Sequence, residues 1–114
     1  MSAARYVPER GDLVWLTFDP QAGHEQAGRR PALVLSPRIY NVKSGLVLVC
    51  PITNQAKGYP FEVVVPIGSG AKGVILADHL KSLDWRARQA QHLGRCAGEV
   101  MDEVRAKLAP LLGY

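Results

Sequence analysis

Short runs of alternating or continuous apolar residues occupy most of the first 85 positions of the chain. The segment 11–19, GDLVWLTFD, begins at Gly11 and is rich in β-branched and aromatic residues. The segment 30–37, RPALVLSP, is a short apolar run that ends at Pro37. Such runs, bounded by turn residues, are typical of β-strands. We therefore predict two strands here, joined by a polar loop.

Further segments up to Trp85 have the same character. A glycine-rich stretch at 67–73 predicts a turn among them, and Pro51 predicts a bulge or an edge position. The additional predicted strands are 44–53, 59–66, 74–80 and 81–85.

The spacing of apolar residues changes after Gly98. Acidic residues open this segment and basic residues follow, an order that suits the helix dipole. Pro110 has no N–H, so we expect it to kink or end the helix near Ala109. The apolar stripe, at spacings of three and four, consists of Val100, Val104, Leu108 and Leu111. Short strands followed by one helix predict a mainly β fold, a strongly bent antiparallel sheet or barrel with a C-terminal α-helix.

Composition places the chain among globular proteins. It has 114 residues, of which 47% are hydrophobic and 21% charged, values expected for one domain spanning 1–114. Cys50 and Cys96 lie far apart without CxxC spacing, so we predict buried thiols in a reducing compartment. Neither His79 nor His92 has a ligand partner at a recognisable spacing, and no metal or cofactor is indicated. Because adjacent residues of a strand point to opposite faces, we expect Asp78 to point away from His79.

The N-terminus lacks the apolar run of a signal peptide, and no segment has the ~18 consecutive apolar residues of a membrane helix. We therefore expect a cytoplasmic protein with no membrane partner. The formal charge of +4 favours a polyanionic partner, although many proteins that bind no nucleic acid carry a similar charge.

The loop GHEQAGRRP, residues 23–31, carries chemistry that a connecting loop does not need. Cutting RNA without a metal requires a base for the 2′-hydroxyl and fixed donors for the charge that develops on the phosphate. Arg30 matches a phosphate bidentately, and Thr53 could donate a hydroxyl to the same group. Glu25 or His24 could accept the proton. Alternatively, these residues are ordinary surface charges and β-residues.

Three stretches carry a resemblance. RYVPERGDLVWLTFDPQAGHEQAGRRPALVLSP, PITNQAKGYPFEVVV and LADHLKSLDWRAR resemble the MazF/PemK family of bacterial toxin endoribonucleases. The resemblance implies an SH3-like barrel with a C-terminal helix. It also implies a homodimeric toxin that cuts single-stranded mRNA at short motifs without metal, leaving 2′,3′-cyclic phosphate and 5′-hydroxyl ends. An antitoxin with a flexible acidic segment is implied as a partner.

The resemblance also implies roles for individual residues. Arg30 and Thr53 match the family's phosphate-activating pair, and Glu25 matches its glutamate. His24 stands where the family often has serine, so the identity of the general base stays open between Glu25 and His24. A gyrase-poisoning toxin of the same fold and a non-catalytic nucleic-acid-binding module are the alternatives.

The loops whose family counterparts line an RNA channel supply the remaining candidates. Tyr59 could stack on a base, lysines and arginines could hold phosphates, and side-chain amides could read base edges. The predicted RNA-binding residues are Gln26, Arg29, Asn54, Gln55, Lys57, Tyr59, Lys81 and Arg86.

Overall fold

The structure is a computed structural model that describes residues 6–18 and 28–114. The strands in this part of the chain are β1 (Asp12–Phe18), β2 (Gly28–Val34), β3 (Leu46–Thr53), β4 (Glu62–Val64), β5 (Val74–Leu76), β6 (Lys81–Asp84) and β7 (Gln91–Arg95). The helices are α1 (Arg38–Ser44), the 3₁₀ turn η1 (Ala77–His79) and α2 (Gly98–Leu112). No helix within these ranges has the length and apolar character needed to span a membrane.

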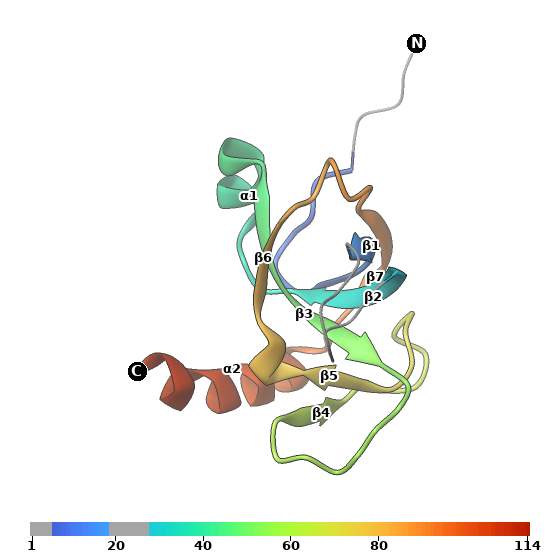
Figure 1. The fold of residues 1–114 in the computed structure, drawn as a ribbon, viewed down its shortest axis with the longest axis vertical. Coiled ribbons are helices and arrows are strands. Elements are labelled where there is room, and N and C mark those ends of the chain that lie inside the picture. Colours follow the sequence, from blue (N-terminus) through green and yellow to red (C-terminus); the bar gives the residue numbers. More distant parts are fainter. Residues whose placement is uncertain (1–5, 19–27) are drawn as a thin grey trace.

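All strand pairs in the sheet are antiparallel, and β3 is the strand that joins its parts. The order is β4-β5-β3-β2-β1-β7, and β6 also pairs with β3, along Leu46 to Val49. Figure 1 shows β3 running from α1 toward β4 and β5. The predicted class, a mainly β antiparallel fold with a C-terminal helix, is confirmed, although the sheet does not close into a ring.

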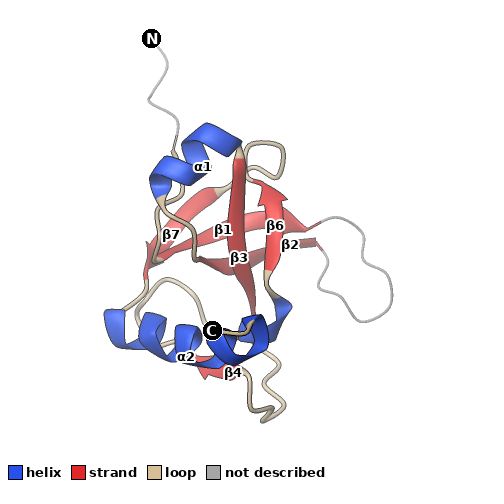
Figure 2. Ribbon diagram, turned by 90° about the vertical axis from the view of Figure 1, so that its left-hand side faces the viewer, coloured by secondary structure: helices blue, strands red, loops and turns tan. Residues whose placement is uncertain are grey.

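Both faces of the bent sheet are buried. Adjacent residues Leu13 and Val14 point to opposite faces of β1, and each is fully buried. Leu13 belongs to a cluster that α2 covers, and Val14 belongs to a cluster that contains Trp85. Figure 2 shows α2 lying across one end of the sheet, beside β4. Burial on both faces explains why the strands contain continuous apolar runs as well as alternating ones.

Helix α1 was not predicted, because it has no apolar stripe. Its buried residue is polar: Asn41 is fully enclosed, and its amide donates to the carbonyl oxygens of Pro8 (2.8 Å) and Ser36 (3.1 Å). The indole of Trp85 donates to the carbonyl of Asn41 at 2.7 Å. Hydrogen bonds of this kind leave no periodic signal in the sequence.

Strand β7 was also missed, since its sequence QHLGR has no apolar alternation and it forms by pairing along the edge of β1. The segment 74–80, predicted as one strand, consists of β5 followed by η1. The segment 59–66 forms only the three-residue β4, after a turn in which Glu62 donates to the carbonyl of Tyr59. The buried thiols Cys50 and Cys96 are confirmed and are not joined.

The expectation that α2 ends near Ala109 is wrong, because the helix continues through Pro110 to Leu112. Ala106 and Pro110 both lie on the exposed side of the helix, where water can hydrate the Ala106 carbonyl, which receives no helical hydrogen bond because Pro110 has no N–H. The true end has two hydrogen bonds: Tyr114 donates to Ala109 at 2.9 Å and Gly113 to Pro110 at 3.4 Å. This is the Schellman arrangement, and it sets the helix end.

Candidate active site

Thr53, the last residue of β3, is held firmly at the end of that strand. It is 7% exposed, pairs with Val74 of β5, and its hydroxyl oxygen accepts the backbone N–H of Gln55 at 3.1 Å. Gly73 passes so close that a Cβ there would lie 2.0 Å from the Thr53 carbonyl oxygen. The position of the hydroxyl is therefore set by backbone on both sides.

Arg30 lies on the neighbouring strand β2, opposite Leu16 of β1. Strands β2 and β3 pair from Val34–Val49 to Ala32–Pro51. Two further steps in this register would bring Arg30 beside Thr53, but the β2–β3 pairing ends at Ala32–Pro51, while Ile52 and Thr53 pair with β5. Adjacent strands therefore carry the two predicted phosphate-activating residues to the same end of the sheet.

Two pockets lie at this end of the sheet, and β3 separates them. Ile52 and Asn54 line the first pocket, of 370 Å³, whereas Thr53 and Gln55 line the second, of 350 Å³. This division follows the alternation of side chains along an extended chain. Arg30 lines the first pocket, so Arg30 and Thr53 belong to different pockets. A substrate that contacts both residues has to cross the end of β3.

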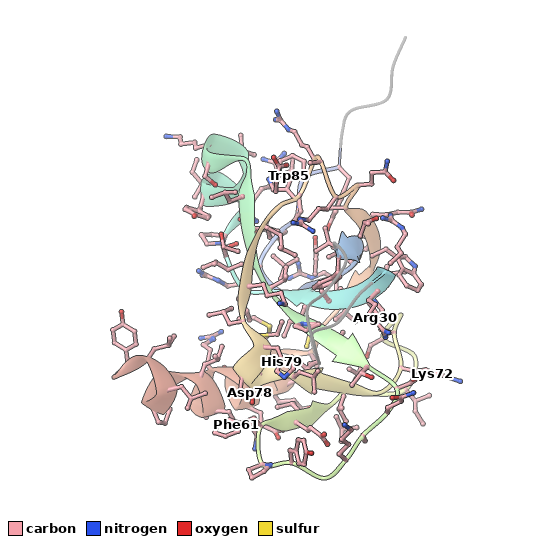
Figure 3. The ribbon with its side chains drawn as sticks, viewed as in Figure 1. Arg30, Phe61, Lys72, Asp78, His79 and Trp85 are labelled. Atoms are coloured by element: carbon pink, nitrogen blue, oxygen red, sulfur yellow. The ribbon has the colours of Figure 1, made fainter. Side chains whose placement is uncertain are left out.

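The first pocket contains a cation that sequence reasoning missed. Lys72 lines it together with Arg29 and Arg30, and Figure 3 shows Arg30 and Lys72 on the same side of the molecule. The sequence predicts only a turn for the glycine-rich stretch 67–73. The feature that could have identified Lys72 as a site residue is its place in a glycine-rich turn, next to the end of a strand.

Arg29 lines the first pocket and also makes hydrogen bonds to other residues of the protein. Its guanidinium donates to the Thr17 hydroxyl (3.0 Å) and to the carbonyl oxygens of Arg88 (3.3 Å) and Gln89 (2.6 Å). A longer contact of 3.4 Å reaches the side chain of Gln91. These bonds fasten the ends of β1 and β2 to the turn before β7.

The loop after β3 presents an aromatic ring to the second pocket. Two oxygens of the Glu62 carboxylate accept the backbone N–H groups of Lys57 and Gly58, each at 3.0 Å, which closes the loop. Tyr59 is 60% exposed and lines the pocket, with the Lys57 ammonium 6.0 Å from its ring centre. Both residues were predicted to bind RNA.

The second pocket also contains Asp78 and His79, which sequence reasoning set aside. The expected strand geometry is wrong: both lie in η1, and Asp78 Oδ1 is 4.0 Å from His79 Nε2. The turn is also bonded to the core, because the buried Cys50 thiol donates a hydrogen bond to the Ala77 carbonyl at 3.6 Å. Burial, and secondarily the charge of Asp78, raises the pKa of the Cys50 thiol to about 12. Cys50 therefore remains a neutral core thiol.

The other predicted residues lie apart or outside the described ranges. Lys81 begins β6, opposite Val49. Arg86 stacks on the Trp85 ring at 4.9 Å and lines a different pocket with Tyr6; Figure 3 shows Trp85 well separated from Arg30. His24, Glu25 and Gln26 lie outside the described residues.

No group of three or more potential metal-ligating side chains was found among residues 6–18 and 28–114. The site in this part of the chain thus consists of a strand-end hydroxyl, cationic side chains and two adjoining pockets.

The family model of the PemK-like, MazF-like toxins of type II toxin–antitoxin systems matches residues 9–112. The chain belongs to this family. The Endoribonuclease toxin MazF of Escherichia coli K12 is 54% identical over 110 residues, which cover 96% of this chain and 98% of that protein.

Solved structures of MazF proteins have the same fold. MazF from Deinococcus radiodurans is 60% identical, superposes with a TM-score of 0.92, and the match covers 96% of this chain and all of that one. A structure of MazE–MazF from the same organism matches with a TM-score of 0.87 at 60% identity, covering 96% of this chain and 98% of that chain. The predicted MazF/PemK resemblance and the predicted class of endoribonuclease toxin are confirmed. The gyrase-poisoning alternative gains no support.

Proposed function

We propose that this MazF-family chain cuts single-stranded RNA by attack of a 2′-hydroxyl on the adjacent phosphate, without a metal ion. The products would be a 2′,3′-cyclic phosphate and a 5′-hydroxyl. The observation that carries this proposal is the placement of Arg30 and Thr53 at the end of adjacent strands, facing pockets on the two sides of β3.

The chemistry assigns different tasks to the two residues. As the oxygen attacks in line, negative charge grows on the nonbridging phosphoryl oxygens, and a guanidinium can bind two of them at once. The Thr53 hydroxyl can donate a further hydrogen bond while its oxygen accepts the N–H of Gln55. The RNA backbone would therefore cross the end of β3 with the reacting phosphate above it.

The phosphates on either side would lie near cations. Lys72 and Arg29 extend the positive charge of the first pocket, and Lys57 lines the second. Such a track attracts a polyanion and makes binding depend on salt. Proton transfer is assigned to Glu25 or His24. If His24 is the base, the rising limb of the single-turnover pH profile near pH 6–7 disappears in His24→Ser.

We also propose an antitoxin partner, a homodimer and action in the cytoplasm. A toxin–antitoxin family implies a neutralising protein, and the relative from D. radiodurans was solved as MazE–MazF. A flexible acidic segment of such a partner would compete with RNA for the cations of the two pockets. Light scattering of the purified chain tests the dimer.

The deciding experiment incubates the purified protein with a long unstructured RNA in EDTA. Discrete fragments whose 5′ ends are hydroxyl groups and whose 3′ ends are cyclic phosphates support the proposal. Intact RNA, or cleavage that needs an added divalent metal, contradicts it.

A further inference from the structure

The second pocket contains polar groups that the cleavage chemistry does not use. Besides Thr53, it is lined by the exposed ring of Tyr59 and by the side chains of Asp78 and His79. Its volume of 350 Å³ lies in the range of small-ligand pockets, about 300–1,000 Å³. An exposed aromatic face beside polar groups matches the way proteins hold single-stranded bases, by stacking and by hydrogen bonds to the base edge.

We propose that this pocket binds one nucleobase next to the cleaved bond, and that the Asp78 carboxylate selects bases carrying an exocyclic amino group. The inference rests on the proposed RNA cleavage and adds a residue that determines sequence preference. Tyr59 supplies the stacking surface, and Asp78 supplies the discriminating contact.

The selectivity follows from hydrogen-bond chemistry. An ionised carboxylate only accepts hydrogen bonds. Adenine, cytosine and guanine each present an amino group that can donate to a carboxylate. Uracil presents one ring N–H that lies between two carbonyl oxygens, and these oxygens repel a carboxylate. A pocket that contains Asp78 therefore disfavours uracil.

The backbone around Asp78 is rigid enough to support this discrimination. Turn η1 packs against both α2 and β3. The N–H of Ala77 donates to the carbonyl of Phe61 at 3.0 Å, and its carbonyl accepts the Cys50 thiol. Figure 3 shows Asp78 and His79 together, above Phe61. The carboxylate is thus carried by a turn fixed on the core, although Asp78 itself is exposed and accessible to a ligand.

Binding tests the pocket independently of cleavage. Fluorescence anisotropy would be measured with 2′-deoxy octamers of adenine, cytosine or uracil, which lack the attacking hydroxyl. Wild type should bind the uracil octamer about 5- to 100-fold more weakly than the other two, the range expected for one base-edge contact. In Asp78→Asn the amide both donates and accepts, so the three affinities should converge.

Two further variants separate reading from stacking. Tyr59→Ala should weaken binding of all three octamers about 5- to 100-fold without changing their order, because stacking tolerates any base. Asp102→Asn removes a carboxylate on α2 that lies 3.8 Å from Arg105, and it should leave all affinities unchanged.

Cleavage then locates the base. RNA carrying one cut site, varied in turn at each flanking position, should lose discrimination against uracil at a single position in Asp78→Asn. An unchanged preference in Asp78→Asn, in binding and in cleavage, overturns the pocket while leaving the endonuclease assignment intact. Absence of cleavage by wild type overturns the assignment, while the octamers still decide about the pocket.

Discussion

Arg29 and Arg30 are adjacent in the sequence but differ in role: Arg29 makes hydrogen bonds within the protein, and Arg30 is assigned to the substrate. Arg29 donates to the Thr17 hydroxyl and to two backbone carbonyls of the turn before β7. Arg30 lines the pocket beside the end of β3 and is the residue assigned to the phosphate. The sequence shows only two adjacent cations, because the two backbone carbonyls that Arg29 binds lie about sixty positions further along the chain.

We predict that Arg30→Ala abolishes RNA cleavage and leaves the fold intact, because the guanidinium acts on the charge of the transition state. Arg29→Ala should instead lower the free energy of unfolding by about 1–2 kcal/mol, the loss of charged hydrogen bonds at an exposed site. Single-turnover cleavage and denaturant unfolding of both variants check this. Equal cleavage rates for Arg30→Ala and wild type would refute the assigned role.

Thr53→Ala should slow cleavage by about 10²–10³-fold, the loss expected when one donor to the developing charge is removed. Thr53→Ser keeps the hydroxyl and should retain most of the rate. If the serine variant is as slow as the alanine variant, the methyl group and its packing matter, and the hydroxyl does not.

The regular elements divide into those that the sequence predicts and those that it does not. Strands β1 to β3 and helix α2 bury apolar side chains, and burial imposes a period that can be recognised. Asn41 is the one buried residue of helix α1, and β7 forms by pairing along the edge of β1. Hydrogen bonds to residues distant in sequence decide these two elements, and spacing along the chain contains no trace of them.

The turn before β5 provides a test of how backbone contact supports the site. Gly73 has φ +110°, and a Cβ would lie 2.0 Å from the Thr53 carbonyl. Gly73→Ala should therefore destabilise the protein by at least about 1–3 kcal/mol and slow cleavage, since Thr53 must shift. Gly68→Ala is the matched control, because φ is +88° but nothing lies within 4 Å. Thermal unfolding and cleavage rates of both variants test this prediction. Equal losses of stability and of rate in the two variants would mean that the positive φ alone, and not the contact with Thr53, is responsible.

Considered as a whole, the molecule should lose stability in alkali. Burial raises the pKa of Cys50 to about 12 from 9.0 and also raises that of Tyr6. The unfolded chain releases these protons first, so the stabilisation is complete below about pH 9 and is lost as the pH rises toward 12. Denaturant unfolding between pH 8 and pH 11 should show this fall. In Cys50→Ala the slope should be smaller, and an unchanged slope would exclude Cys50 as a source.

The candidate site was only partly predictable, because contacts between residues distant in the sequence bring some of its side chains together. Arg30, Thr53 and Tyr59 are candidates because of their side-chain chemistry, and the resemblance to a known family supports Arg30 and Thr53 as a pair. The division into two pockets follows from the alternation of side chains at the end of β3, beyond its last pair with β2. Lys72 and Asp78 flank β5 and reach the site through its pairing with β3, which spacing along the chain does not predict; for Lys72 the glycine-rich turn beside a strand end is the one local signal.

Because β3 pairs with β2, β5 and β6, its amides cannot open without separating much of the sheet. Its buried amides should therefore exchange with deuterium only through global unfolding, whereas those of α1 and β7 exchange through local opening. Native-state hydrogen exchange measures the difference. Thr53 ends β3, so its hydroxyl should keep its position as long as the molecule stays folded. Loss of cleavage under denaturing conditions should therefore coincide with global unfolding.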